Sequence, residues 1–173
     1  MTAETYPEIR DAVARLCTRF PGSYWRELDR RMAYPQAFVD TLTAEGWLAV
    51  LIPEEYGGAG LPLSAAAAIL EEIQRAGCNG GACHAQMYTM GTLLRHGSAT
   101  QKQAYLPSIA AGRLRLQAFG VTEPSSGTDT AALKTTARRD GGHYVVNGQK
   151  IWTSRAEHSD LMLLLARTTP LAD

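Results

Sequence analysis

Residues 119–129 of the chain read Phe-Gly-Val-Thr-Glu-Pro-Ser-Ser-Gly-Thr-Asp, in which a short strand-like start runs into a loop of small and polar residues. This stretch follows a change in hydrophobic periodicity near Gly112. Apolar residues recur at helical spacing before this glycine and alternate with polar residues after it, as they do in strands. The sequence therefore predicts an α+β chain, with an N-terminal all-α helical domain over residues 1–112 and the start of an antiparallel β-barrel or sandwich domain over residues 113–173.

The part before Gly112 contains the signals of five helices. They are expected from Pro7 toward Phe20, from Pro35 to Gly46, from an N-cap at Ser64 to Gly77, from about Ala82 to His96, and after Ser98. Ser98 and Gln101 have capping-box spacing, which indicates where the last helix begins. Pro107 should kink or split that helix, because proline removes a backbone N–H and clashes with the preceding turn.

The part after Gly112 contains strand signals. Alternation begins at residues 114–118, and short strands are expected at residues 135–139, 143–146, 149–152 and 161–167. Asp-Gly-Gly at 140–142 and Asn-Gly at 147–148 indicate hairpin turns, because these residues tolerate a positive φ. The last strand is almost wholly apolar, so it should be buried on both faces.

Charge and composition exclude several classes of protein. Lys plus Arg number 17 and Asp plus Glu also number 17, so the chain lacks the basic excess that binds nucleic acid. The longest apolar runs, at 47–52 and 161–166, are too short to span a bilayer. Residues 1–4 lack the basic start of a signal peptide. The chain has only three cysteines, a small and odd number that does not favour a disulfide framework. We therefore expect a cytoplasmic protein without a membrane span.

Two features point toward a ligand. The loop at 122–129 holds four hydroxyl side chains whose neighbouring backbone N–H groups can bind a phosphate, although a plain turn is the alternative interpretation. Trp152 and Ser154 would share one face of a strand, where an aromatic ring beside a hydroxyl suits an aromatic heterocycle. A core tryptophan is the alternative there.

Other candidate sites have simpler interpretations. The glycines at 57–60 lack Rossmann spacing and do not follow a strand. Cys78, Cys83 and His84 match no standard zinc pattern, so no metal site is assigned. The adjacent acidic pairs at 54–55 and 71–72 do not face each other on a helix, which indicates a solvated surface.

Three motifs, taken together, resemble the acyl-CoA dehydrogenase family. Gly46-Trp47 and residues 53–60, Pro-Glu-Glu-Tyr-Gly-Gly-Ala-Gly, are similar to the signature of its helical domain. Residues 121–129 are similar to its first flavin segment, and residues 147–154, Asn-Gly-Gln-Lys-Ile-Trp-Thr-Ser, to its second. The resemblance implies a helical domain, a middle β-domain and a C-terminal helical bundle. This chain would supply the first domain and the opening half of the second, with the bundle absent.

The resemblance also implies FAD as the cofactor and assigns seven residues to it. Phe119, Val121 and Thr122 would lie along the flavin ring, Gly127 and Thr128 at the pyrophosphate, Trp152 against the isoalloxazine, and Ser154 near its N5. Thr128 stands where the family usually has Ser, Ser154 replaces its more usual Thr, and Arg155 follows where Asn is common. These departures leave the substrate subgroup open.

The implied reaction is α,β-dehydrogenation of an acyl-CoA thioester, with electrons passed to an electron-transfer flavoprotein. The full-length protein would be a homo-oligomer, a dimer or a tetramer. No catalytic residue is assigned, because the family's base comes from the C-terminal bundle, and this chain alone should retain FAD weakly or not at all. Part of the segment at 87–94 is expected to line the substrate. The alternatives are a non-catalytic helical interaction module and a relative that oxidises a non-CoA substrate at the same flavin site.

Overall fold

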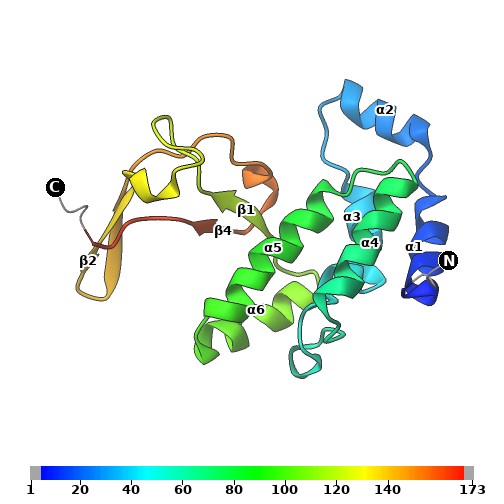
Figure 1. The fold of residues 1–173 in the computed structure, drawn as a ribbon, viewed down its shortest axis with the longest axis horizontal. Coiled ribbons are helices and arrows are strands. Elements are labelled where there is room, and N and C mark those ends of the chain that lie inside the picture. The colour runs from blue at the N-terminus through cyan, green and yellow to red at the C-terminus, as the bar shows by residue number, and fades with distance from the viewer. Residues whose placement is uncertain (1–4, 170–173) are drawn as a thin grey trace. The chain divides into compact units, whose positions relative to one another are not determined.

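The computed structural model of the chain describes residues 5–169, which form parts of two compact units, Met1–Leu116 and Gln117–Asp173 (Figure 1). The helices of the first are α1 (Pro7–Cys17), α2 (Gly22–Arg30), α3 (Gln36–Ala44), α4 (Leu63–Arg75), α5 (Gly81–His96) and α6 (Ala99–Ala110). The strands that follow are β1 (Leu116–Gly120), β2 (Thr136–Asp140), β3 (His143–Asn147) and β4 (Leu161–Leu164). Residues 1–4, which bear on the signal-peptide prediction, lie outside the described residues.

The core of the helical unit is formed by α1, α3, α4 and α5, which lie side by side in Figure 1. The largest fully buried side chains there include Val13, Phe38, Leu42, Ile69 and Ile73. A membrane-crossing helix is not found in the described part of the chain, where the longest helix, α5, has 16 residues. The apolar stripes of the predicted helices thus pack against one another, as amphipathic helices do in a globular unit.

The predicted helix ends are largely confirmed. Helix α3 begins directly after Pro35, and α5 ends at the residue before Gly97. The capping box of α6 is present, because the Ser98 hydroxyl accepts from the Gln101 N–H (3.2 Å) and the Gln101 side chain accepts from the Ser98 N–H (2.9 Å). Both bonds satisfy N–H groups that the first turn of a helix leaves without partners.

Three details of the helical unit differ from the sequence prediction. Ser64 does not cap α4, which begins at Leu63, and its hydroxyl instead hydrogen-bonds to that of Tyr6 at 2.7 Å. Pro107 lies inside α6 without splitting it, because the buried residues Leu106 and Ile109 anchor the helix on both sides. Helix α2 was not predicted; it buries no residue fully and contacts the core through the rings of Tyr24 and Trp25, which pack against Phe20 and Phe38.

The interpretation of residues 71 and 72 as a solvated surface is wrong for Glu72, which is only 5% exposed. The Arg10 guanidinium of α1 reaches both carboxylates, at 2.7 Å from Glu72 and 2.6 Å from Glu71, and Arg75 lies 3.2 Å from Glu72. The two acidic side chains do not need to face each other, because the guanidinium group of Arg10 contacts both carboxylates. This ion pair links α1 to α4.

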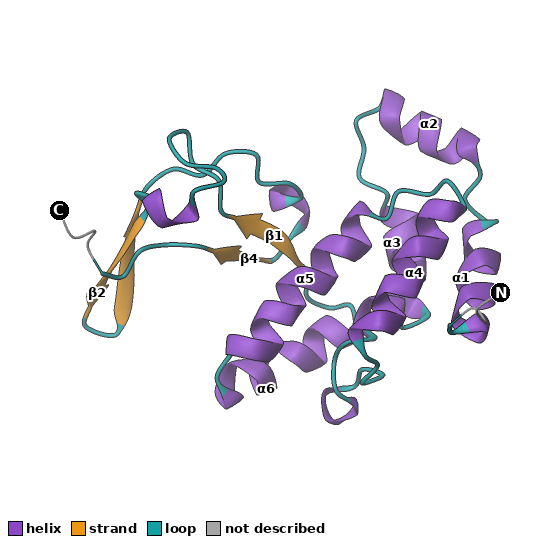
Figure 2. Ribbon diagram, viewed as in Figure 1, coloured by secondary structure: helices purple, strands orange, loops and turns teal. Residues whose placement is uncertain are grey.

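The hairpin of β2 and β3 is confirmed in the second unit (Figure 2). The strands pair antiparallel from Thr136 opposite Asn147 to Asp140 opposite His143, which leaves a two-residue turn. Gly141 in that turn has a φ of +57°, a conformation that glycine adopts at low cost. The second sheet pairs β1 with β4, and the four described strands form no closed barrel.

Two strand predictions are wrong in this unit. Residues 149–152 form no strand, since the backbone turns at Trp152 (φ +59°), and Trp152 and Ser154 therefore do not share a strand face. Just before this segment, a Cβ on Gly148 would lie 2.6 Å from the Thr135 Cα, so the backbones there are in close contact. Strand β4 is shorter than predicted and is not buried on both faces: Met162 is 43% exposed, because within the described residues β4 pairs with β1 alone.

We predict that Arg10→Met lowers the free energy of unfolding of the helical unit by on the order of 3 kcal/mol, because it leaves the buried Glu72 without its main partner. The matched control is Arg19→Met, whose ion pair with Glu45 is exposed and should contribute about 0–1 kcal/mol. Chemical denaturation followed by circular dichroism measures both. Equal losses in the two variants would contradict the prediction.

Candidate functional site

The two sequence motifs of the second unit lie side by side in the structure. The Ile151 N–H donates to the Thr122 carbonyl at 2.9 Å, which joins residues 119–122 to residues 150–154. A Cβ on Gly120 would lie 3.5 Å from the Lys150 side chain, so the segments approach closely there. We call these two stretches, residues 119–122 and 150–154, the paired segments.

A buried carboxylate lies next to the paired segments. The Glu123 side chain is 3% exposed and accepts hydrogen bonds from the N–H groups of Lys134 (2.6 Å) and Thr135 (2.8 Å). The Lys150 ammonium, 8% exposed, lies 2.8 Å from the same carboxylate and also donates to the Val121 carbonyl at 2.9 Å. Buried charges are stable only when they are paired and hydrogen-bonded, and both conditions are met.

The surroundings of Glu123 favour its charged form. The hydrogen bond from the Lys150 ammonium, together with the N–H groups of residues 134 and 135, lowers the pKa of this carboxyl group to about 2. Hydrogen bonds to a carboxylate stabilise the deprotonated state, which opposes the effect of burial. Glu123 is therefore an anion at neutral pH and serves as an acceptor.

The loop that follows is closed on itself. Glu123 and Ser126 exchange backbone hydrogen bonds at 2.8 and 3.2 Å, and the Ser126 hydroxyl donates to the Asp129 carbonyl. Gly127 and Thr128 are exposed, and a Cβ on Gly127 would meet no atom within 4 Å. The loop therefore presents the backbone of residues 127 and 128 to solvent, where a ligand can reach it.

The seven residues assigned to the flavin all lie in the second unit. Phe119, Val121 and Thr122 are half-buried, Gly127, Thr128 and Ser154 are exposed, and the Trp152 ring is 85% exposed. The structure brings together the residues of the two paired segments through the bond between Ile151 and Thr122. No hydrogen bond within residues 5–169 joins residues 127–128 to residues 152–154, so the loop and the paired segments are separate parts of the candidate site.

Sequence reasoning missed the charged pair of Glu123 and Lys150. Both residues were part of the quoted motifs, but neither received a role. A signal was available, because Lys150 is the one charged side chain in residues 147–154 and Glu123 directly follows Thr122, which the resemblance assigns to the flavin. A single charge in an otherwise neutral motif is a candidate for a buried partner elsewhere in the fold.

The cysteines do not form a metal site in the described part of the chain, where no three metal-ligating side chains come together. Cys17, Cys78 and Cys83 are all buried and free. Burial raises the pKa of the Cys17 and Cys83 thiols to about 12. Both thiols are therefore protonated at neutral pH, which makes them poor ligands and poor nucleophiles.

Comparison with known proteins gives the same family for both units. Residues 3–113 match the family model of the acyl-CoA dehydrogenase N-terminal domain, and residues 118–173 match the model of the acyl-CoA dehydrogenase middle domain. The chain belongs to the acyl-CoA dehydrogenase family. The fold is accordingly the helical N-terminal domain of an acyl-CoA dehydrogenase followed by the start of its middle β-domain.

Individual relatives agree with this assignment. The chain is 42% identical over 147 residues to the acyl-CoA dehydrogenase FadE29 of Mycobacterium tuberculosis, covering 84% of this chain and 37% of the relative. It is 37% identical over 144 residues to the 3-(aryl)acrylate reductase of Clostridium sporogenes, covering 82% and 38%. The crystal structure of an acyl-CoA dehydrogenase from Geobacillus kaustophilus is similar with a TM-score of 0.88 at 27% identity, covering 99% of this chain and 46% of that one. The chain thus spans less than half the length of these acyl-CoA dehydrogenase relatives.

We predict that the Glu123 carboxyl titrates near pH 2, which carbon-detected NMR of the side chain can measure directly. Because the folded-state pKa lies below the ordinary value of 4.5, the carboxylate stabilises the fold above pH 4.5. This contribution is lost as the pH falls from 4.5 toward 2. Glu123→Gln should therefore make the unfolding free energy of the second unit less dependent on pH across that window. A midpoint at 4.5 in the wild-type chain would contradict the prediction.

Proposed function

We propose that this chain forms the N-terminal part of an FAD-dependent acyl-CoA dehydrogenase, which catalyses α,β-dehydrogenation of an acyl-CoA thioester and passes the electrons to an electron-transfer flavoprotein. The observation that carries the proposal is the ordered match of both family domains along one chain. We place the helical domain at residues 1–112 and the partial β-domain at residues 113–173. The working protein is proposed to be a cytoplasmic homo-oligomer.

The chemistry of the exposed groups fits a flavin nucleotide. Trp152 offers a flat apolar ring that protein atoms leave almost uncovered. Thr122, Thr128 and Ser154 supply hydroxyl groups, and Gly127 leaves its backbone open to a pyrophosphate. An aromatic surface with a few polar groups nearby is the usual composition of a cofactor site.

When bound, the flavin supplies the acceptor for the hydride that leaves the β-carbon. The residues of this chain bind and orient it. We propose that Phe119, Val121 and Thr122 lie along the ring, while Trp152 packs against it and excludes water. The Ser154 hydroxyl can donate or accept a hydrogen bond, so it can serve the ring nitrogen in either redox state.

The acyl group is proposed to contact helix α5. A cavity of about 610 Å³ in the helical unit is lined by Met87, Tyr88 and Gly91 of this helix, together with Leu51 and Leu63. The lining is mainly apolar, which suits a hydrocarbon chain. The catalytic base is not assigned to any residue of this chain, and we propose that it lies in the family's C-terminal helical bundle.

A second candidate function has specific support. The Clostridium sporogenes relative is named for an arylacrylate rather than for an acyl-CoA. A relative that acts on a non-CoA substrate at the same flavin site is therefore the alternative. The two candidates differ in the group attached to the carbonyl carbon, which a substrate panel can distinguish.

The test begins with the intact mass and flavin absorbance of the purified protein. Acyl-CoA thioesters and free arylacrylates or arylpropionates are then added without oxygen. The proposal expects acyl-CoA-dependent loss of the flavin absorbance band and an enoyl-CoA product two mass units lighter than the substrate. A response to the free acids alone would favour the second candidate, and a protein that binds no flavin at any length of chain would favour the non-catalytic module. The 173-residue chain alone is expected to retain FAD weakly or not at all and to form no product.

We predict that Gly127→Ala weakens FAD binding without changing stability. The glycine has open space around its Cβ position and no left-handed backbone conformation, so the fold accepts alanine there. A pyrophosphate bound at this backbone would meet the added methyl group. Gly142→Ala, which has equally open space in the hairpin turn, is the matched control. Titration with FAD followed by flavin fluorescence measures the affinity, and equal affinity of the two variants would contradict the assignment of Gly127.

A further inference from the structure

The paired segments are joined by one charged pair whose two side chains are almost fully buried. Glu123 and Lys150 come from different motifs, 27 residues apart in sequence, and their charged atoms lie 2.8 Å apart. We propose that Glu123 and Lys150 are positioning residues, which hold residues 119–122 against residues 151–154 in the arrangement that receives the flavin. This inference rests on the proposed flavin site.

Two adjacent links fix the position of one segment on the other. The Lys150 ammonium donates to the Val121 carbonyl at 2.9 Å, and the Ile151 N–H donates to the Thr122 carbonyl at 2.9 Å. Consecutive residues of one segment thus hold consecutive carbonyls of the other. A single bond would leave the segments free to rotate about it, whereas two neighbouring bonds define both position and direction.

Glu123 connects this arrangement to a third part of the unit. Its two carboxylate oxygens accept from the consecutive N–H groups of Lys134 and Thr135, at the start of the hairpin. The carboxylate therefore cannot follow a displaced Lys150 without giving up these bonds. Both side-chain oxygens at position 123 must be hydrogen-bond acceptors, because each of them faces an N–H donor.

The flavin-facing residues cannot hold themselves in place. Trp152 is 85% exposed, Ser154 is exposed, and Val121 and Thr122 are only half-buried. Groups that a ligand must reach contribute little packing of their own. The buried charged pair is a stronger constraint, since loss of one partner leaves an uncompensated charge in the interior.

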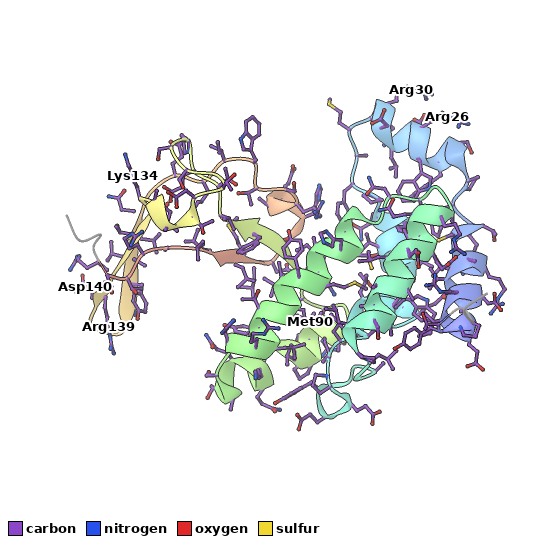
Figure 3. All side chains as sticks on the ribbon, viewed as in Figure 1. Arg26, Arg30, Met90, Lys134, Arg139 and Asp140 are labelled. Atoms are coloured by element: carbon purple, nitrogen blue, oxygen red, sulfur yellow. The ribbon has the colours of Figure 1, made fainter. Side chains whose placement is uncertain are left out.

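The first test needs no flavin. We compare Lys150→Met with Arg139→Met in the ¹⁵N-labelled chain; Arg139 is exposed on β2, and its replacement removes the same charge (Figure 3). Amide hydrogen exchange at Ile151 should be at least about tenfold faster in Lys150→Met and unchanged in Arg139→Met, as expected for loss of a charge-assisted hydrogen bond. Amides of the helical unit should exchange at the wild-type rate in both. Equal protection of Ile151 in the two variants would overturn the proposal.

The second test adds FAD and follows its fluorescence. The dissociation constant should rise at least about tenfold in Lys150→Met relative to Arg139→Met, and Lys150→Arg should recover part of the loss because it restores the cation. Equal affinities of the two methionine variants would overturn the positioning role. The affinities are compared in the full-length protein, because this chain alone is expected to retain FAD weakly or not at all. If the full-length protein binds no FAD, the proposed flavin site fails, while the exchange measurement still decides whether the pair holds the segments.

A variant with the two charges exchanged tests whether any pair of opposite charges at positions 123 and 150 is sufficient, or whether the carboxylate must be at position 123. Glu123→Lys with Lys150→Glu keeps one charge of each sign but points an ammonium at the N–H groups of residues 134 and 135. We expect this double variant to leave Ile151 as unprotected as Lys150→Met does. Recovery of wild-type exchange in the double variant would show that pairing alone suffices and would contradict the role of Glu123.

Discussion

The carboxylate of Glu123 determines where three segments of the C-terminal unit lie. It accepts from the backbone at the start of the β2–β3 hairpin and from the Lys150 ammonium, which in turn holds the Val121 carbonyl. The unit also has backbone bonds between Arg167 and the segment that begins the hairpin, but its four strands are short and form two separate pairs. A small sheet with few apolar contacts needs polar constraints to define one arrangement, and a buried charge provides one because no other arrangement satisfies it.

The helical unit also contains a buried ion pair that connects two segments of the chain. There Arg10 of α1 reaches Glu72 of α4, again with little exposure of either side chain. In that unit, however, the apolar core of four helices already determines the packing, so the ion pair adds to an arrangement that burial favours by itself. In the C-terminal unit the relative importance of apolar burial and ion pairing is reversed. The charged pair there contributes more to the arrangement of the segments, since residues such as Val145 and Met162 remain close to half exposed.

Much of the fold followed from local sequence signals, and the failures have identifiable causes. Helices with clear stripes and caps, such as α6 with its N-cap at Ser98, formed as predicted because their signals lie within a few residues of one another. The strand predicted at 149–152 failed because the contact between Gly148 and Thr135 and the turn at Trp152 are tertiary features. The buried state of Glu72 depends on a partner from another helix, and the pairing of Glu123 with Lys150 is likewise a tertiary contact, of which the sequence showed only the isolated charge of Lys150. The seven flavin residues came from motif resemblance, and their roles stay predictions.

The exposure of the candidate site explains why the residues that support it differ in kind from the residues proposed to bind the flavin. A side chain that touches a cofactor must remain uncovered until the cofactor binds, so Trp152 and Ser154 contribute little to the fold that presents them. The constraint on their position must then come from groups that the cofactor does not reach. Lys150 satisfies this condition, because it directly precedes the exposed segment in sequence and yet has its charge buried against Glu123. Only Ile151 lies between Lys150 and Trp152, so the backbone of one residue connects the buried ammonium group to the ring that is proposed to contact the flavin.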